Sequence, residues 1–306
     1  MNKYAIFLIL LCLTGCGMNE LEDIEFDSAK SEMRDFTIKE DSQIVSEQLN
    51  LEKINVLQDI SLINDDIYLL DSEPNSIKRY NLNGELIESH DLSQIPNPSL
   101  MKGNQEYIYI YDSAINKVFV LNFDYDIIHE ISIKSIMSDS RIVDMEVYQD
   151  KVFLSADAVE EDDAVIVSYD LEGNEEIIVK NVNGYIGSLN GSLYMTNTLE
   201  YVKTNEGYGF QSGKNMFTKI YPEKTDVLKF PNAYMPVDFV GTESRLYVFN
   251  TSILTLDLWN LDTGEYDSTL LSFNGKDEQN IKLDMNEKVL IILLKDSNQL
   301  YKLNLE

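Results

Sequence analysis

The chain has 306 residues, of which 44% are hydrophobic and 25% are charged. Asp and Glu number 53 against 24 Lys and Arg, so the formal net charge is −29 at pH 7. The apolar fraction suffices for a packed core and excludes a wholly disordered acidic chain. The charge excludes nucleic acid as a partner, because clustered Lys and Arg supply most of the binding to phosphates.

The first residues have the pattern of a secretory signal. A short basic segment, Met1-Asn2-Lys3, precedes an apolar run from Tyr4 to Leu13 that is too short to span a bilayer. Leu13-Thr14-Gly15-Cys16 resembles the bacterial lipobox, in which a peptidase cleaves before a cysteine that carries a diacylglycerol. We therefore predict a lipoprotein signal peptide over residues 1–15. An ordinary secretory signal or an uncleaved anchor is the alternative.

Lipidation of Cys16 would hold the protein on a membrane of the bacterial cell envelope, outside the cytoplasm. Several acyl chains, palmitate among them, give a stable anchor. Cys12 lies in the predicted signal peptide, so the mature chain would have one cysteine and no disulfide. Residues 16–44 are predicted to be the lipidated cysteine followed by a flexible acidic tether, with a short amphipathic helix packed on the domain as the alternative.

A strand-like segment recurs six times after residue 45. In each copy a β-branched residue or Leu begins an apolar run that leads to Asp or Asn. The copies begin at Ile67, Ile108, Val152, Leu193, Leu246 and Val289. Successive starts lie 41, 44, 41, 53 and 43 residues apart. A period in the forties with strand patterning alone is typical of propeller blades.

Each copy fits the second strand of a four-stranded antiparallel blade. An inner strand precedes it, as in Val56–Ile63, and later strands follow tight turns such as Asn83-Gly84. The sixth unit ends one strand short, whereas Ser46–Glu52 is strand-like and belongs to no unit. We predict an all-β, six-bladed propeller over residues 45–306, in which this N-terminal strand completes the last blade. A two-sheet sandwich is the alternative.

These features resemble the six-bladed β-propeller lipoproteins of bacteria, within the broader NHL- and TolB-like propeller group. The resemblance rests on the aromatic second strand, as in Ile67-Tyr68-Leu69-Leu70-Asp71, and on turns of the Asn/Asp-x-x-Gly type, as at residues 81–84. It implies a rigid ring at the cell envelope. It does not imply one activity, because function depends on the site and not on the fold.

Functional residues are expected on the face of the ring that carries the longer connections, around the central channel. The longest unit contains residues 198–214, where Tyr201, Tyr208 and Phe210 are interleaved with glycines. Such aromatic side chains suit stacking on a sugar, a peptide or a partner surface. A small hairpin that caps the ring with its own aromatic residues is the alternative.

Carboxylates are the second group of candidates. Four aspartates occupy comparable places in the predicted inner strands of units one, three, five and six, namely Asp59, Asp144, Asp238 and Asp284. If they converge on the channel they could bind Ca²⁺, which prefers oxygen ligands. The acidic residues 157–163 could also bind Ca²⁺. In so acidic a chain, solvated strand ends and a solvated loop are the alternatives. Calcium is the only cofactor that the sequence leaves open.

Catalytic motifs are absent from the sequence. His90 and His129 are expected in outer strands, and Trp259 is expected to pack between blades. There is no Gly-x-Ser-x-Gly elbow, no His-Glu-x-x-His and no paired Cys/His spacing. The sequence therefore favours a monomeric, lipid-anchored module that binds or scaffolds a protein, a peptide or a glycan. The alternative is a calcium-dependent hydrolase or lyase with a carboxylate-lined channel.

Overall fold

The structure is a computed structural model that describes residues 46–51, 54–134, 141–157, 164–180, 184–204, 207–231, 234–273 and 280–305. Within these ranges the side chains of residue 157 and of residues 198–214 are outside the description. The predicted signal peptide, Cys16, the tether and the acidic residues 158–163 also lie outside the described residues. In the part of the chain that is described, no helix is long and apolar enough to span a membrane.

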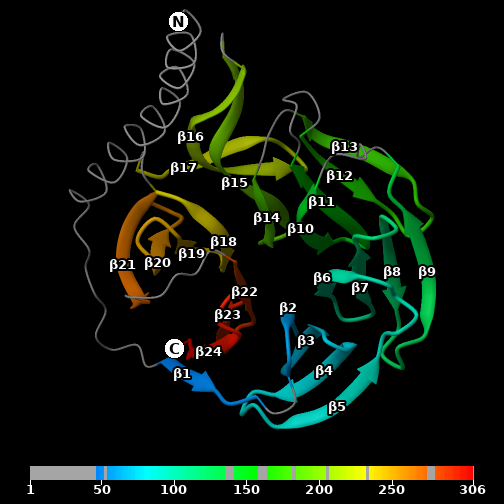
Figure 1. Ribbon diagram of the computed structural model, residues 1–306. Helices are drawn as coiled ribbons and strands as arrows, with labels where there is room; N and C mark the ends of the chain where they lie inside the picture. The colour runs from blue at the N-terminus through cyan, green and yellow to red at the C-terminus, as the bar shows by residue number, and fades with distance from the viewer. Residues whose placement is uncertain are drawn as a thin grey trace, which may run out of the picture.

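The described chain forms six four-stranded antiparallel sheets that stand around a central axis (Figure 1). The inner strands are β2 (Leu57–Ile63), β6 (Pro98–Gly103), β10 (Arg141–Tyr148), β14 (Tyr185–Leu189), β18 (Pro236–Gly241) and β22 (Ile281–Met285). The second strands are β3 (Asp66–Ser72), β7 (Ile108–Asp112), β11 (Lys151–Asp157), β15 (Ser192–Thr204), β19 (Arg245–Asn250) and β23 (Val289–Leu294). The six-bladed propeller predicted from the repeat spacing is confirmed.

Two further strands complete each blade toward the outside. The third strands are β4 (Asn75–Asn81), β8 (Lys117–Leu121), β12 (Val165–Tyr169), β16 (Gly207–Tyr221), β20 (Thr255–Asn260) and β24 (Gln299–Asn304). The outer strands are β5 (Leu86–Asp91), β9 (Ile127–Ser132), β13 (Glu175–Lys180), β17 (Thr225–Lys229), β21 (Glu265–Ser272) and β1 (Ser46–Leu49). His90 and His129 lie in outer strands, as the sequence predicts.

The ring closes through the inner strands and through β1. Each inner strand contacts the next one in chain order, and β22 contacts β2. In blade six, β1 pairs antiparallel with β24 so that Leu49 lies opposite Leu300. Leu49 is 5% exposed, and Lys302 Nζ lies 2.9 Å from a carboxylate oxygen of Glu47. β1 thus covers the edge of β24, which would otherwise present unpaired backbone groups.

Hydrophobic residues gather at the interfaces between blades. The described residues form six clusters, and each of them joins two neighbouring blades. All five residues of β7 are buried. Alternate side chains of a strand point to opposite sides of the sheet, and both sides of a blade are covered. This explains the unbroken apolar runs in the second strands. Trp259 packs against Phe230 and Tyr234 between blades four and five, as predicted.

The recurrent Asp or Asn after the second strand ties two connections together. Asp71 accepts backbone N–H groups from Asn55, Val56 and Glu73 at 3.1, 3.0 and 3.1 Å. Burial opposes its charge, but the hydrogen bond from Lys78 and these N–H groups lower the pKa of Asp71. The same role falls to Asp112 and Asn250 in blades two and five. The motif is therefore a structural device that joins the segment entering a blade to the turn leaving its second strand.

Candidate functional site

The two faces of the ring differ in their connections. The strands are antiparallel, so the turns between first and second strands and those between third and fourth strands lie on one face, here named the turn face. The predicted short turns Asn64-Asp65 and Gln149-Asp150 belong to it, and Asn64 has a φ of 57°. The remaining connections lie on the opposite face, here named the loop face. The inner strands stand around the central axis between these two faces (Figure 1), and the space that they surround is here named the channel.

The four predicted aspartates do converge on the channel, where they link neighbouring blades. Asp59 accepts the backbone N–H of Ile60 at 2.9 Å on one oxygen and that of Met101, in the next blade, at 2.8 Å on the other. Three further carboxylates bond the inner strand of the following blade in the same way, in the pairs Asp144–Ile186 (2.9 Å), Asp238–Leu283 (2.7 Å) and Asp284–Leu62 (2.9 Å). Charge-assisted bonds of this kind are shorter and stronger than neutral ones.

A lysine takes the place of the aspartate in blade six. The first and second strands of each blade pair residue by residue, and the pairs are counted here from the start of the first strand. The second pair is Asp59↔Leu70 in blade one and Asp238↔Phe249 in blade five. The corresponding pair in blade six is Lys282↔Leu293, and β22 has no bulge at this point. Asp284 therefore lies two residues further along its strand than the comparable position. The expectation that all four aspartates occupy equivalent places is wrong in this one case.

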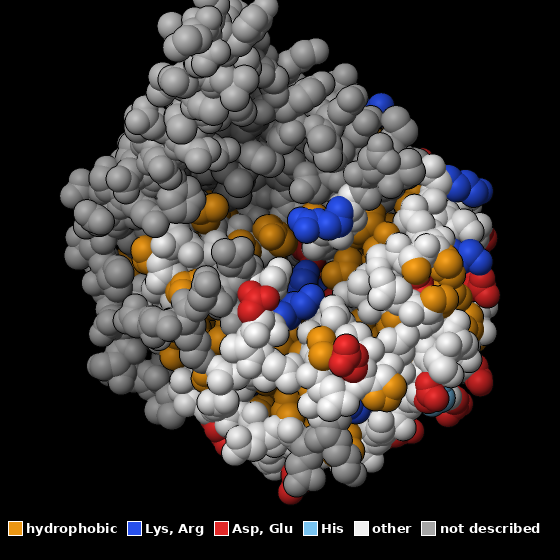
Figure 2. Space-filling model, viewed as in Figure 1, with side chains coloured by type: hydrophobic (Ala, Val, Ile, Leu, Met, Phe, Trp, Pro, Cys, Tyr) orange, Lys and Arg blue, Asp and Glu red, His pale blue; other side chains and the backbone are white. Residues whose placement is uncertain are grey.

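Lys282 crosses the channel to the opposite blade. Its Nζ lies 2.5 Å from Oδ1 of Asp144, and the two side chains are 8% and 3% exposed. Lys102 of blade two lies 3.7 Å from Asp284, and both retain some exposed surface. Seen along the axis, Lys and Arg side chains occupy the centre of the ring (Figure 2). The channel thus holds several buried carboxylates, whose negative charge the ammonium groups of Lys282 and Lys102 offset in part.

Burial and neighbouring opposite charges shift the pKa values of these groups in opposite directions, because burial disfavours the charged form and an opposite charge favours it. Burial alone would lower the pKa of Lys282, but Asp144, Asp59 and Asp238 raise it well above its ordinary value. Burial raises the pKa of Asp59, against the influence of Lys282 and Lys102. Burial also raises the pKa of Asp238 to about 7; Lys282 opposes this rise and the charge of Asp144 adds to it.

A pH dependence of stability follows from Asp238. An unfolded Asp has a pKa of ~3.9, so between about pH 4 and 7 the folded protein binds a proton that the unfolded chain does not. The contribution of Asp238 to the free energy of unfolding is complete below about pH 4. It falls as the pH rises from there through 7, by up to ~1.4 kcal/mol per pH unit. We expect Asp238→Asn to flatten the curve of unfolding free energy against pH over this window.

The control is Asp262→Asn, which removes the same charge from an exposed turn. Urea unfolding at pH 5, 6, 7 and 8 measures both curves. Asp71 does not interfere, because a lowered pKa affects stability only as the pH falls below about 4. Equal slopes in the wild type and Asp238→Asn would contradict the assignment.

The calcium prediction can be tested against this geometry. Both oxygens of each aspartate already accept a hydrogen bond, and Lys282 and Lys102 supply the positive charge. Among the described residues, no group of three or more His, Cys, Asp or Glu is placed to hold a metal ion. In this arrangement the four aspartates are engaged with backbone N–H groups and with lysine, and calcium binding stays a prediction that titration must decide.

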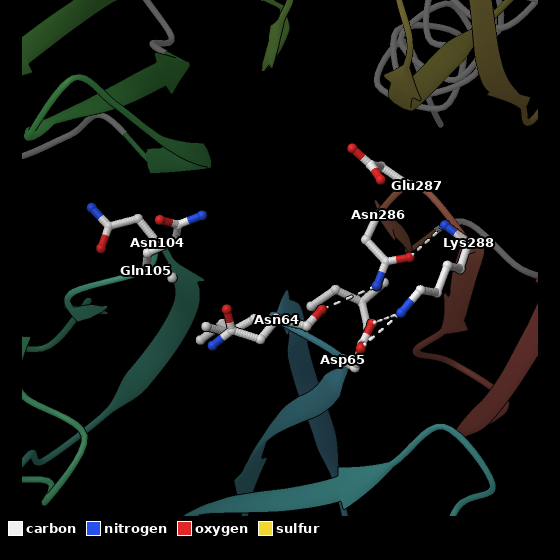
Figure 3. Close-up of a pocket in the computed structure, with 10 residues that line it drawn as sticks. Asn64, Asp65, Asn104, Gln105, Asn286, Glu287 and Lys288 are labelled. Atoms are coloured by element: carbon white, nitrogen blue, oxygen red, sulfur yellow. Dashed lines mark hydrogen bonds and ion pairs between the residues drawn. The ribbon is translucent and has the colours of Figure 1, made fainter.

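A hollow of about 490 Å³ opens on the turn face, which the sequence did not single out. Three turns line it: β2–β3, β6–β7 and β22–β23. Figure 3 shows Asn104 and Gln105 on one side, Asn286 and Glu287 on the other, and Asn64 between them. No sequence signal could have revealed this hollow, because its walls come from turns that lie about 40 and 180 residues apart.

The predicted aromatic residues of unit four lie on the extended β15–β16 hairpin. The register sets Tyr201 opposite Phe210 and Tyr208 opposite Lys203. Residues 198–214 are thus paired strand over most of their length, and not an irregular loop. Their side chains are outside the described part of the chain, so stacking by Tyr201, Tyr208 and Phe210 stays a prediction.

No model of a known protein family matches the sequence, and no curated protein sequence matches it. Solved structures match its fold. A virginiamycin B lyase from Staphylococcus aureus is 13% identical, with a TM-score of 0.57 over 86% of this chain and 100% of that one. A Bacteroides fragilis protein described as exported is 12% identical, with a TM-score of 0.55 over 87% and 96%. The nidogen/laminin complex contains a chain that is 12% identical, with a TM-score of 0.51 over 70% and 79%. At such identities the likeness shows the propeller fold alone.

Proposed function

We propose that the protein is a lipid-anchored propeller of the bacterial cell envelope that binds a protein, peptide or glycan ligand and does not catalyse a reaction. The main support for a binding role is the hydrogen bonding of the carboxylates in the channel. Asp59 and Asp238 each use both oxygens to hold backbone N–H groups, and Asp144 is held by Lys282 from across the ring. A general acid or base must lie within hydrogen-bond distance of the substrate proton, whereas these oxygens already accept backbone N–H groups or the ammonium group of Lys282.

A rigid ring with a hollow on one face suits binding. The blades are joined by six buried apolar interfaces and by the channel hydrogen bonds. The turns therefore stand on a framework that is already ordered before a ligand binds, which reduces the entropy lost on binding. Propellers of this general fold include chains found in protein complexes, such as the nidogen/laminin chain, and a lyase. The fold therefore admits both function classes, and the site must decide between them.

Calcium titration separates the binding module from the calcium-dependent enzyme. For a binding module without a channel metal we expect the melting temperature of the full-length protein to stay constant on addition of millimolar Ca²⁺, relative to the same concentration of Mg²⁺. A ligand that binds only the folded state raises stability by RT ln(1 + [L]/Kd). A saturable, calcium-specific rise would refute this part of the proposal and favour the hydrolase or lyase.

The anchor is tested separately. Metabolic labelling with an alkyne fatty acid is expected to label the wild type in a bacterial host and to leave Cys16→Ala unlabelled and released from the membrane. Cys12→Ala is the matched control and should be labelled normally, because Cys12 lies before the predicted cleavage site. Labelling of Cys16→Ala would show that the lipobox assignment is mistaken.

A further inference from the structure

We infer that the hollow on the turn face is a binding site for a neutral or basic saccharide. This inference rests on the proposed function, since it names the ligand class of the binding module. The hollow has a volume of about 490 Å³, within the range of roughly 300–1,000 Å³ that is usual for small-ligand sites. It lies at the mouth of the channel, where the turns of blades six, one and two meet (Figure 3).

Polar side chains with unused hydrogen-bonding groups face the hollow from three turns. Within the described residues, the side chains of Asn64, Gln105 and Glu287 make no hydrogen bond or ion pair, although all three are exposed. An amide offers two donors and an acceptor, and a carboxylate offers two acceptors. These groups can pair with the neighbouring hydroxyl groups of a sugar, each of which donates one hydrogen bond and accepts up to two.

The charge of the lining limits the choice of saccharide. Lys288 Nζ lies 3.0 and 2.8 Å from the two carboxylate oxygens of Asp65, so this pair neutralises itself. Glu287 then carries the one uncompensated charge among the lining residues that the structure describes. A uronic acid or other acidic sugar would meet Glu287 and the field of a chain with a net charge of −29. A neutral or amino sugar would not be repelled.

The turns are fixed before a ligand arrives. Asn286 donates to the backbone oxygen of Asn64 at 3.0 Å and accepts the N–H groups of Lys288 and Val289 at 2.9 and 3.0 Å. Asn104 accepts the N–H groups of two residues in its own turn at 2.8 Å. Two asparagines thus hold the backbone, while their neighbours Glu287 and Gln105 remain available to a ligand. Such pre-organisation reduces the entropy lost on binding.

The lining favours a saccharide over a peptide side chain. Of the described residues that line it, only Leu62 and Ile63 are large and apolar, and Ile63 is 3% exposed. Peptide recognition is usually anchored by an apolar or aromatic side chain that fills a matching pocket. Here an apolar anchor would cover the amides and the carboxylate without satisfying them, which is unfavourable.

The experiment uses the full-length protein in detergent and four probes: glucose, N-acetylglucosamine, glucosamine and glucuronate. Saturation-transfer NMR detects binding and calorimetry measures Kd. We expect the neutral or basic sugars to bind and glucuronate to bind at least tenfold more weakly. Gln105→Ala and Glu287→Ala should each weaken the best sugar at least tenfold, and Glu287→Ala should also reduce the discrimination against glucuronate. Both positions are exposed and unbonded, so these variants are expected to fold.

Glu243→Ala is the matched control, because Glu243 is an exposed acid in the corresponding β18–β19 turn and does not line the hollow. It should leave every Kd unchanged. Binding that survives Gln105→Ala and Glu287→Ala would overturn the assignment to this hollow. Binding of a peptide library with no binding of saccharides would overturn the inference and leave the proposed function intact. Failure of both ligand classes would count against the proposed function as well.

Discussion

Replacing Lys282 by methionine is expected to lower the free energy of unfolding by about 3–5 kcal/mol. The substitution keeps an unbranched apolar side chain of similar length and removes the ammonium group, whose Nζ lies 2.5 Å from Asp144 Oδ1. Asp144 is 2% exposed, and Asp59 and Asp238 contribute to the same field around Lys282. A buried carboxylate that loses its counter-charge retains the full penalty of burial, which is why removing one partner is so unfavourable.

The control for Lys282→Met is Lys117→Met, which breaks the pair with Glu130 on the outside of blade two. Lys117 and Glu130 are 33% and 50% exposed, so we expect a change below about 1 kcal/mol. The deficit of Lys282→Met should shrink at low pH. Lys282 lowers the pKa of Asp59 and Asp238, so its loss lets these buried carboxylates take up protons more readily as the pH falls. Urea unfolding at pH 5 and pH 8 measures both effects. Similar losses in the two variants would mean that the channel pair is as weak as a surface pair.

Removal of β1 is expected to be the second large effect. Deleting residues 17–49 should lower the free energy of unfolding by about 4 kcal/mol relative to deleting residues 17–44, which leaves β1 in place. Burial of Leu49 contributes ~2 kcal/mol, and the hydrogen bonds between β1 and β24 contribute ~0.5–1.5 kcal/mol each. The deletion also exposes the edge of β24, which should promote self-association.

Thermal unfolding and light scattering report the two consequences of losing β1. The shorter deletion is expected to remain monomeric, whereas the longer deletion should melt earlier and form larger species. If the two deletions behave alike in both measurements, β1 does not close the ring in solution. Cys16 is kept in both variants, so any difference between them arises from residues 45–49 alone.

Several features of the fold could be predicted because they depend on short stretches of chain. The second strand of every blade is covered on both sides, so each copy appears as an apolar run such as Ile108-Tyr109-Ile110-Tyr111. Tight turns require residues that tolerate positive φ, and Asn64 and Gly84 supply them. The recurrent Asp after the strand was visible as a pattern, whereas its bonds to a preceding segment, as for Asp71, were not.

The channel was predicted only in part. Acids in inner strands could be identified, because the repeat places them there. Their partners could not, since Lys282 lies 138 residues from Asp144 in the chain. Asp284 also lies two residues past the level of the other aspartates, because Lys282 occupies the corresponding place in β22. Whether a buried carboxylate binds a metal or an ammonium group depends on which side chain faces it across the ring.

The sequence by itself determined the all-β class, the number of blades and the strand left over to complete the sixth, because these follow from local periodicity and from counting. Only the tertiary structure decided that the channel is filled by Lys282 and Lys102, and that turns of three blades enclose a polar hollow. Both features are set by side chains brought together through ring closure. Ring closure brings together residues that lie far apart in the sequence, and nothing in the sequence indicates that they are neighbours.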